Sequence, residues 1–447
     1  MAKSIMWPQM MIEPDRRHGL TVIPGGLEQS IKINRVDVPL AVLLGDSNGH
    51  SLPKLFHPDY LSTRTPEEHE RLRLQGVDVL HLKLELTHSF TTSFGTIKDK
   101  DIILVVLKTA GGIEGIGECS VNPNPDYNEE SAETVLTVLD KHLIPIIGEL
   151  MGVSSIEDLT RSYENIKGNF AAKTGIEAAY WDLLSKTENT ALHKYWGGRQ
   201  VHVQTGVSIG GKTTEEVLHR VDKAVERGFS RVKLKIWPGF DTRVVEEVRS
   251  RYSDLPLQVD ANSAYTLEDI DVFKELDHYG LILIEQPFSQ YDLLDHARLQ
   301  TQIETPVCLD ESLKTVAIVR QAMELWAHIG KLDKLIINIK PPRMGGYWEA
   351  VKTADLCEAA GVRAWCGGML DTSWTKRMNV QLSSHPAFVL PGDHAQQEPY
   401  YREDIADAPI QGRHGIISLP RLSQRYEDLD WSAIRKNTVS SKSYRFS

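Results

Sequence analysis

The sequence predicts an α/β fold in which strands and helices alternate around a closed barrel, attached to a smaller α+β unit. Short apolar runs recur along the second half of the chain, separated by charged segments with helical periodicity such as LEDIDVFKELDHYG. This alternation is typical of βα units with a parallel sheet. Runs at VHVQTGVS and RVKLKI precede the series and AFVLPG follows it, so seven or eight units favour a barrel over an open sheet. The five central runs begin 24, 25, 28 and 29 residues apart, near Leu257, Leu281, Pro306, Lys334 and Arg363.

The region before the barrel reads as a sheet followed by helices. VLHLKLEL alternates apolar and polar residues, and DIILVVLKTAGGIEGIGECS reads as two strands joined by a glycine-containing turn. Helical stretches follow at SAETVLTVLDKHLIPII and TGIEAAYWDLLSKT. We therefore expect an α+β domain over residues 78–200, the barrel over 201–392, and a segment over 393–447 that returns to the first domain.

Residues 1–77 differ from the rest of the chain. They are rich in Pro, Gly, Asn and Asp, and we expect an N-terminal extension of unknown role. One helix is predicted within it, at TPEEHERLRLQG, because Thr65 can cap the helix and Pro66 suits its first position.

Composition narrows the classes of partner. The chain has 447 residues, with 50 Lys and Arg against 61 Asp and Glu, and a net charge of −11. This balance argues against a nucleic-acid partner, which needs a basic face. The four cysteines are too scattered for a disulfide framework, no apolar run is long enough to predict a membrane span, and the N-terminus lacks the apolar core of a signal peptide. We expect a cytoplasmic protein without a membrane partner.

Three carboxylates end consecutive predicted strands. Asp260, Glu285 and Asp310 are separated by 25 and 25 residues, one βα unit each, so they should stand side by side at the barrel mouth. Three ionised carboxylates would repel one another and raise one another's pKa values. A hard divalent cation removes this conflict, and oxygen ligands favour Mg²⁺, with Mn²⁺ as a substitute.

Lysines end two further strands. Lys233 and Lys235 alternate along RVKLKI and share one face, which points into the barrel mouth if the apolar residues between them face the helices. Two ammonium groups this close predict a lowered pKa for one of them, which suits a catalytic base. Lys340 ends the sixth unit, so Lys235 and Lys340 should flank a metal-held ligand from opposite sides.

A cation between two lysine bases indicates proton abstraction next to a carboxylate. The metal would hold the substrate carboxylate, one lysine would remove the proton from the adjacent carbon, and the metal would stabilise the resulting enediolate. Reprotonation from the opposite face would give racemisation, and loss of a β-hydroxyl would give dehydration.

A set of motifs over residues 79–395 is specific in combination: SFTTSFGT, GIGECS, GVSIGG, RVKLKIWPGFD, LQVDANSAYTL, LILIEQPF, TPVCLDES, INIKPPRMGGY, WCGGMLDT and LPGD. In these motifs the chain resembles the enolase superfamily, in its muconate-lactonizing-enzyme-like branch. Within that branch it is similar to o-succinylbenzoate synthases and N-acylamino acid (N-succinylamino acid) racemases. The resemblance implies a (β/α)7β modified TIM barrel with an α+β capping domain.

The resemblance also implies roles for individual residues. Lys235 and Lys340 would be the acid/base pair, and Asp260, Glu285 and Asp310 the Mg²⁺ ligands. The implied substrate-binding residues are Ser208, Lys233, Asn262, Gly367, Gly368, Met369, Phe94 and Tyr127.

Four residues depart from the family pattern. Asp371 stands where Glu is usual, and Trp374, Thr375 and Lys376 stand where small residues are usual. We expect these residues to reshape the substrate pocket, with Lys376 adding charge for a second carboxylate. On this basis N-succinyl substrates with large apolar side chains are expected to be preferred over N-acetyl substrates.

Alternatives remain open at this stage. A dipeptide epimerase or a cycloisomerase would share the same intermediate. A Schiff-base aldolase would use Lys235 or Lys340 as a nucleophile, although the carboxylate triad argues against it. A non-catalytic barrel would have no need of the bases and ligands, and a homo-oligomer is compatible with the sequence.

Overall fold

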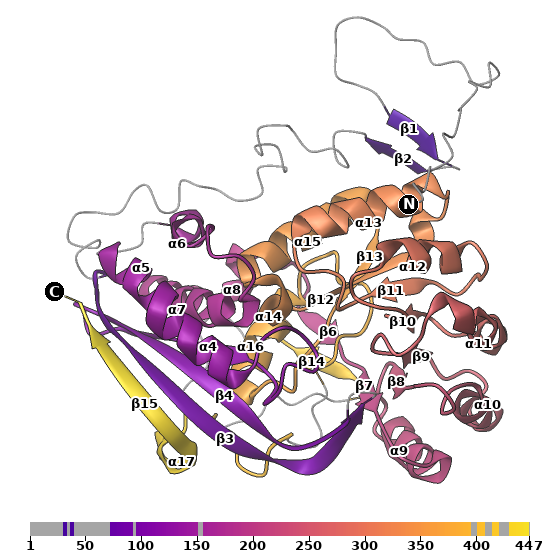
Figure 1. Ribbon diagram of the computed structural model, residues 1–447, viewed down its shortest axis with the longest axis horizontal. Helices are drawn as coiled ribbons and strands as arrows, with labels where there is room; N and C mark the ends of the chain where they lie inside the picture. The colour runs from indigo at the N-terminus through magenta and orange to yellow at the C-terminus, as the bar shows by residue number, and fades with distance from the viewer. Residues whose placement is uncertain are drawn as a thin grey trace, which may run out of the picture.

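The computed structural model describes residues 30–33, 36–39, 72–92, 95–150, 155–394, 400–406, 414–419 and 429–446. Two sheets dominate this part of the chain (Figure 1). One is a four-stranded antiparallel sheet with helices packed against it, and the other is a curled seven-stranded parallel sheet covered by helices. The fold is therefore mixed α/β, as the sequence predicts.

The antiparallel sheet has the strand order β15-β3-β4-β5. It confirms the three strands expected from the sequence before the first helices. The fourth strand, β15, comes from the far end of the described chain and pairs with β3 along its length, so that Gly76 lies opposite Arg445. The strands are β3 (Leu74–Thr92), β4 (Gly95–Thr109), β5 (Glu114–Ser120) and β15 (Thr438–Arg445), and the helices beside them are α4 (Ala132–Val138), η1 (Leu139–Leu143), α5 (Ile144–Glu149), α6 (Ile156–Ser162), α7 (Phe170–Glu188), α8 (Leu192–Tyr195) and α17 (Trp431–Asn437).

Helix α7 packs unusually close to β5, and two glycines make this possible. A Cβ atom on Gly117 would lie 2.0 Å from the carbonyl oxygen of Gly175, and one on Gly175 would lie 2.2 Å from the sulfur of Cys119. The glycines of GIEGIGE therefore serve packing between strand and helix, as well as the turn that the sequence predicts.

The parallel sheet has the strand order β13-β12-β11-β10-β9-β8-β7. Its inner surface carries the charged strand ends described below, and its outer surface packs on the helices. The strands are β7 (Val207–Ile209), β8 (Val232–Lys235), β9 (Leu257–Asp260), β10 (Ile284–Glu285), β11 (Val307–Leu309), β12 (Leu335–Ile339) and β13 (Arg363–Cys366). The helices are α9 (Thr214–Glu226), α10 (Thr242–Arg251), η2 (Leu267–Asp269), α11 (Ile270–Leu276), η3 (Asp277–Tyr279), α12 (Leu293–Gln300), α13 (Val316–His328), η4 (Leu332–Lys334), α14 (Pro341–Met344), α15 (Tyr347–Ala360) and α16 (Ser373–Leu382).

Two segments near the sheet edges differ from the sequence prediction. VHVQTGVS is two strands, because β6 (His202–Gln204) leaves the parallel sheet and pairs antiparallel with β14 (Ile416–Ser418). AFVLPG forms only isolated parallel bridges, from Phe388 to Ala364 and from Gly392 to Thr205. These bridges still place the segment between β13 and the residues that precede β7.

The helix predicted at TPEEHERLRLQG is wrong at its end, because Leu74 to Gly76 open strand β3, which pairs with both β4 and β15. Its earlier residues, 65–71, lie outside the described residues. The extension contributes two short strands, β1 (Ser30–Ile33) and β2 (Val36–Pro39), which pair antiparallel with each other.

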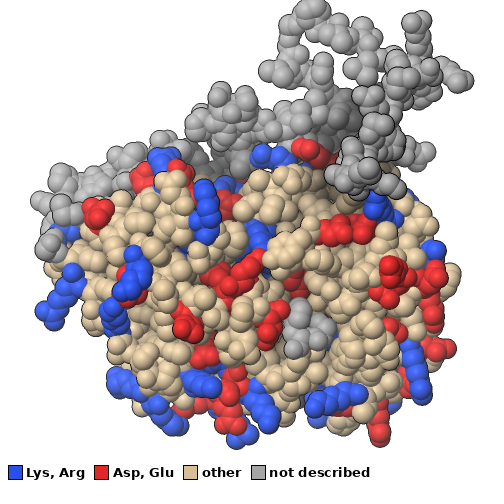
Figure 2. All heavy atoms as spheres, viewed as in Figure 1, with Lys and Arg blue, Asp and Glu red and all other residues tan. Residues whose placement is uncertain are grey.

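The described surface mixes charges. On the face in Figure 2, acidic and basic side chains are interspersed, in keeping with the acidic balance of the whole sequence. None of the helices among the described residues has both the length and the apolar character needed to cross a membrane.

Candidate active site

Charged side chains at the ends of the parallel strands meet on the inner side of the sheet. Strand β8 supplies Lys233 and Lys235 at alternate positions, and Leu234 between them packs in the main apolar core. Strands β9 and β10 end at Asp260 and Glu285, which are register partners. Asp310 follows β11 directly. The strand-end pattern in the sequence therefore does correspond to one cluster in space.

A cavity of about 290 Å³ opens beside this cluster. Its other walls come from the antiparallel sheet, namely the tip of the β3–β4 hairpin and the loop after β5. Phe94 lies outside the described residues, and Gly367 is not among the lining residues. The predicted residues that line the cavity are Tyr127, Ser208, Lys233, Lys235, Asn262, Lys340, Gly368 and Met369.

Gly367 has a different function from the predicted one of lining the pocket. A Cβ atom at this position would lie 2.4 Å from an oxygen of Asn338 and 2.6 Å from Cε of Lys340. The missing side chain lets the Lys340 stem pass close to the backbone after β13.

The two proposed bases are each held by a carboxylate. Lys235 Nζ donates to Asp260 Oδ2 at 2.6 Å and to Asn262 Oδ1 at 2.8 Å. Lys340 Nζ donates to Asp310 Oδ2 at 2.6 Å and to the hydroxyl of Tyr127 at 3.0 Å. Both ammonium groups thus end at the same cavity, from strand ends on different sides of it.

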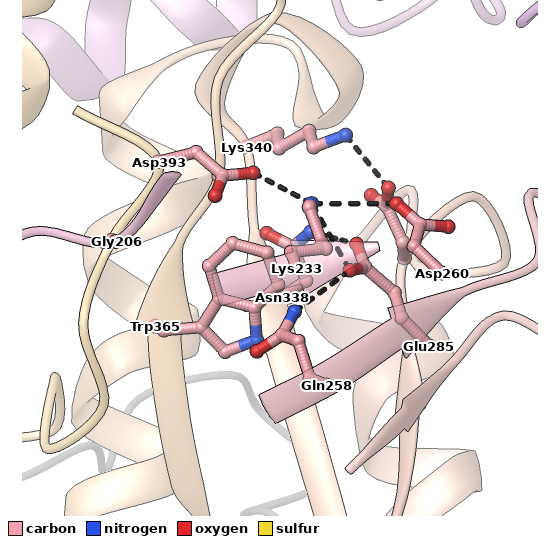
Figure 3. A network of polar contacts seen from close by, with 12 residues as sticks. Gly206, Lys233, Gln258, Asp260, Glu285, Asn338, Lys340, Trp365 and Asp393 are labelled. Atoms are coloured by element: carbon pink, nitrogen blue, oxygen red, sulfur yellow. Dashed lines mark hydrogen bonds and ion pairs between the residues drawn. The ribbon is translucent and has the colours of Figure 1, made fainter. Parts of the chain in front are cut away.

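Lys233 is bound more tightly into the site than the sequence suggests. Its Nζ donates to Asp393 Oδ2 at 2.6 Å and to Glu285 Oε2 at 3.1 Å, and lies 4.8 Å from the ring centre of Trp365 (Figure 3). Burial alone would lower the pKa of Lys233, but the carboxylates of Asp393, Glu285 and Asp260 raise it above its ordinary value. The predicted lowering by the neighbouring lysine is therefore wrong for Lys233. Carboxylates from other strands outweigh one like charge.

The carboxylates respond differently to burial. Burial, and then the neighbouring charge of Asp260, raise the pKa of Glu285 to about 8, although Asn338 Nδ2 donates to it at 2.8 Å. Burial acts against Asp260 as well, but Lys235 and Lys233 hold its pKa at about 2. Lys340 and Arg343 lower the pKa of Asp310 against the effect of burial.

The donor set suits a hard divalent cation. It consists of buried carboxylate oxygens, and Oε2 of the adjacent Glu311 is buried with no hydrogen-bond partner among the described residues. The three predicted ligands do not bring one oxygen each within 4.8 Å of one another, because the lysine ammonium groups lie between them. Asp260, Glu285 and Asp310 are the residues that would hold the cation, and Glu311 lies beside them, where its Oε1 accepts from Asn262 Nδ2 at 2.9 Å.

Among the described residues, the group whose ligand atoms do lie within 4.8 Å is Asp355, Glu358 and His385. His385 Nε2 lies 3.1 Å from Asp355 Oδ1, and His385 Nδ1 accepts from the backbone N–H of Ala387 at 3.2 Å. An Nδ1 that accepts a hydrogen bond places the imidazole proton on Nε2, which then donates to Asp355 and has no lone pair for a metal. This tautomer argues against a metal at the second cluster.

The four departures from the family pattern lie behind the pocket wall. Trp374 is buried on the antiparallel sheet, where its Nε1 donates to the carbonyl of Ile116 at 3.0 Å, and Thr375 donates to Glu118 Oε2 at 2.7 Å. Lys376 lies 3.6 Å from the ring centre of Tyr400, which lines the cavity, and burial lowers its pKa to about 8. Trp374 and Thr375 thus contact the antiparallel sheet, and Lys376 is next to the cavity only through Tyr400, so none of these three side chains is among the lining residues.

Asp371 reaches the pocket through the backbone. Its Oδ2 accepts from the N–H of Met369 at 3.1 Å, while its Oδ1 lies 2.8 Å from Ser120 Oγ. The same hydroxyl lies 2.9 Å from Glu118 Oε1, and one hydroxyl proton cannot serve two carboxylates. Burial and the charge of Asp371 raise the pKa of Glu118. The network joins β5 to the segment that lines the cavity.

Sequence reasoning missed Asp393 and Arg343. Asp393 ends LPGD and is also bound by Arg231 Nη1 at 2.8 Å, and the strand-end rule applied to the eighth apolar run would have identified it. Arg343 lies one turn after Lys340 and contacts Asp310 from α14. The pattern of strand ends does not predict a contact made by a side chain from the helix that follows the strand.

Two family models match the chain. Residues 76–197 match the N-terminal domain of mandelate racemase and muconate lactonizing enzyme, and residues 216–423 match the enolase C-terminal domain-like family. The chain belongs to the enolase superfamily. The two matches follow the two sheets, which meet at the candidate site.

Individual relatives place the chain in the muconate-lactonizing-enzyme-like branch of this superfamily. An o-succinylbenzoate synthase from Geobacillus kaustophilus is 37% identical over 372 residues, which cover 83% of this chain and 97% of that protein. An N-succinylamino acid racemase from Amycolatopsis is 38% identical, covering 78% of this chain and 96% of that protein. The crystal structure of a superfamily member from Listeria innocua matches with a TM-score of 0.78 at 35% identity, covering 84% of this chain and all of that one. The chain is an enzyme of this superfamily.

Proposed function

We propose that this enzyme removes the proton α to a substrate carboxylate, and that it acts as an o-succinylbenzoate synthase, an N-succinylamino acid racemase, or both. The observation that carries the proposal is the pair Lys235 and Lys340, whose ammonium groups open on one cavity from different strand ends. The names of the relatives described above support the same reaction class.

The architecture is part of the proposal. We infer that the parallel sheet is the (β/α)7β barrel, closed by the bridges from Phe388 to Ala364 and from Gly392 to Thr205. The α+β capping domain would comprise residues 78–200, and residues 393–447 would return to it, as the pairing of β15 with β3 supports. Active sites of such barrels lie at the C-terminal ends of the strands, where the lysines and carboxylates are found.

The mechanism assigns a task to each group around the cavity. Bound at Asp260, Glu285 and Asp310, Mg²⁺ or Mn²⁺ would supply positive charge for the substrate carboxylate and for the enediolate that forms on proton loss. Lys233 is fixed by Asp393 and Glu285, so it offers a stationary charge to the substrate carboxylate. Lys235 and Lys340 take or return the α proton from opposite faces.

The two outcomes differ in the fate of one substrate bond. In a racemase, the second lysine donates a proton to the face opposite the one that was deprotonated. In a synthase, the lysine that removed the α proton donates it to the β-hydroxyl, which leaves as water. Dipeptide epimerisation and cycloisomerisation are the alternative activities with related chemistry.

Exchange of the α proton with solvent tests the proposal. N-succinylamino acids and the hydroxylated precursor of o-succinylbenzoate are incubated with the enzyme and Mg²⁺ in D₂O, and deuterium at the α carbon, rotation and dehydration are followed. We expect exchange or dehydration with at least one of them. Absence of both with every substrate, in protein shown to be folded, would contradict the proposal.

A further inference from the structure

One turn in the wall of the reaction cavity has a strained backbone. Gly368, Met369 and Leu370 follow strand β13 and line the cavity, and we call them the cavity turn. The φ angle of Leu370 is 56°, in a region that residues with a Cβ atom rarely adopt. Of the described non-glycine residues with a positive φ, Leu370 alone has an apolar side chain, so it cannot stabilise this backbone by hydrogen bonds of its own. Contacts from elsewhere must therefore hold the turn.

Tyr401 holds the cavity turn on its carbonyl side. The side chain is buried, and its hydroxyl donates to the carbonyl oxygen of Leu370. Tyr401 is itself fixed to the antiparallel sheet by a bridge to Leu86 of β3. Next to it, the N–H of Arg402 donates to the carbonyl oxygen of Glu85, also in β3, at 3.0 Å. The hydroxyl thus links the strained residue to a sheet that is remote in sequence.

Asp371 holds the turn on its amide side. Its Oδ2 accepts from the backbone N–H of Met369 and from Asn379 Nδ2, both at 3.1 Å. Its Oδ1 lies 2.8 Å from the hydroxyl of Ser120, which ends β5. All four residues are buried. Because the loop that follows β5 lines the same cavity, the contact between Ser120 and Asp371 joins two of the cavity walls.

Relaxation of the turn would alter the cavity. If the φ angle of Leu370 returned to the negative range that L-residues prefer, its side chain would move relative to the backbone of Gly368 and Met369. All three residues line the cavity, so the wall would change shape. Proton transfer depends on Lys235 and Lys340, which are held by other groups. Relaxation should therefore weaken substrate binding more than it slows proton transfer.

We propose that Tyr401, Asp371 and Ser120 are positioning residues that hold the strained cavity turn in the conformation that fits the substrate. None of these three side chains is among the residues that line the cavity, so each acts through the backbone of the turn. The fit of the substrate then depends on how the antiparallel sheet is placed against the parallel one. The inference rests on the proposed function only for its activity measurement, because the strain and its anchors can be measured without a substrate.

The first test measures kcat and KM for α-proton exchange, with the N-succinylamino acid that exchanges fastest in D₂O. Tyr401→Phe and Ser120→Ala each remove one hydroxyl. The control Tyr252→Phe removes a hydroxyl that donates to Asp222 Oδ1 at 2.7 Å, and neither of these residues lines the cavity. We expect the first two variants to raise KM about threefold to tenfold and to change kcat less than twofold, and the control to change neither. An unchanged KM in both anchor variants would overturn the proposal.

A second test separates backbone strain from the loss of a hydrogen bond alone. Leu370→Gly and Leu370→Ala remove the same wall side chain, but only glycine adopts a positive φ without strain. Tyr401→Phe should raise KM about threefold or more in the Leu370→Ala background, and less than about twofold in the Leu370→Gly background. An equal effect in both backgrounds would overturn the proposal, because the hydroxyl would then not act through the φ angle of Leu370.

Unfolding temperatures test the same strain without a substrate. By differential scanning fluorimetry we expect Leu370→Gly to unfold roughly 1–2 °C above Leu370→Ala, the reverse of the order at ordinary positions. Adding Tyr401→Phe to both should reduce this difference by about half or more, because the alanine variant can then relax. If the folded wild type exchanges no substrate, the proposed reaction is wrong, and these midpoints alone judge the anchors. A glycine variant no more stable than the alanine variant, or a difference that Tyr401→Phe does not change, would overturn the proposal.

Discussion

Lys235 and Lys340 donate to different carboxylates, Asp260 and Asp310, and so approach the substrate from different strand ends. In a two-base mechanism each lysine serves one enantiomer. We expect Lys235→Ala to lose racemisation by more than a hundredfold while exchange persists with one enantiomer, and Lys340→Ala to retain exchange only with the other. Proton NMR in D₂O with each enantiomer measures this. Equal loss for both enantiomers in both variants would argue for a single base.

Glu285 and Asp355 allow the two carboxylate clusters to be compared as metal sites. A cation that binds only the folded protein raises its unfolding temperature, and at a hundred times the dissociation constant it adds about 2.7 kcal/mol. We expect Mg²⁺ to raise the unfolding midpoint of the wild type and of Asp355→Asn, but to have little effect on Glu285→Gln. Differential scanning fluorimetry with and without EDTA measures the shifts. Loss of the shift in Asp355→Asn alone would place the metal at the second cluster.

At the scale of elements, Glu177 ties helix α7 to helix α15. Its Oε1 accepts from Trp181 Nε1 at 3.1 Å and from the backbone N–H of Trp348 at 2.7 Å, and burial raises its pKa from 4.5 to about 8. The folded protein therefore holds a proton that the unfolded chain releases above about pH 4.5. This contribution to stability is lost as pH rises toward 8, by up to about 1.4 kcal/mol for each pH unit.

Glu177→Gln removes this proton linkage while keeping the size of the side chain. We expect the unfolding free energy of the variant, relative to that of the wild type, to increase from pH 5 to pH 8 in urea titrations. Glu133→Gln, at an exposed position in α4, is the control. A difference between Glu177→Gln and wild type that does not change with pH would show that the carboxyl is ionised throughout.

The elements also show what could be predicted from the sequence. Strands β8 to β12 are apolar runs that end in a charged residue or are followed directly by one, and this local pattern is enough to find both the strands and Lys235, Asp260 and Glu285. VHVQTGVS keeps its alternation across Thr205 and Gly206, so nothing local marks the point where β6 leaves for another sheet. Gly206 lies against Arg231, which comes just before β8, and a Cβ atom at Gly206 would lie 2.6 Å from the Arg231 guanidinium.

The pKa of a site residue was harder to predict than its position, because the pKa depends on charged residues that lie far away in the sequence. The pKa of Lys233 is set mainly by burial and by Asp393, which lies 160 residues later in the sequence. Trp374 and Lys376 follow a pocket motif, yet Trp374 donates to the carbonyl of Ile116 in the antiparallel sheet, and Lys376 stacks on Tyr400 without lining the cavity itself. The spacing of the strand ends therefore predicted where the lysines and carboxylates lie. It did not predict their pKa values or which side chains pack behind the residues that line the cavity.

At the scale of the whole molecule, strand β15 closes the antiparallel sheet. Deleting residues 438–446 would expose the edge of β3 and remove the hydrogen bond from Tyr444 to Asp140 Oδ1, at 2.7 Å. We expect the unfolding midpoint to fall by on the order of 5–10 °C and light scattering to increase, because unpaired edges promote aggregation. Val439→Thr, at an exposed position of β15, should have little effect. An unchanged midpoint after deletion would show that β15 is not structurally required.

The pairing of β15 with β3 also has a consequence during biosynthesis. A ribosome makes β3, β4 and β5 early, but the partner for the free edge of β3 emerges only after the whole parallel sheet has been translated. At the usual elongation rate of roughly 5–20 residues per second, that edge stays open for tens of seconds. The nascent chain thus presents an unpaired strand for most of its synthesis. Cellular yield would then depend on chaperones that shield this edge, as well as on the stability of the finished fold.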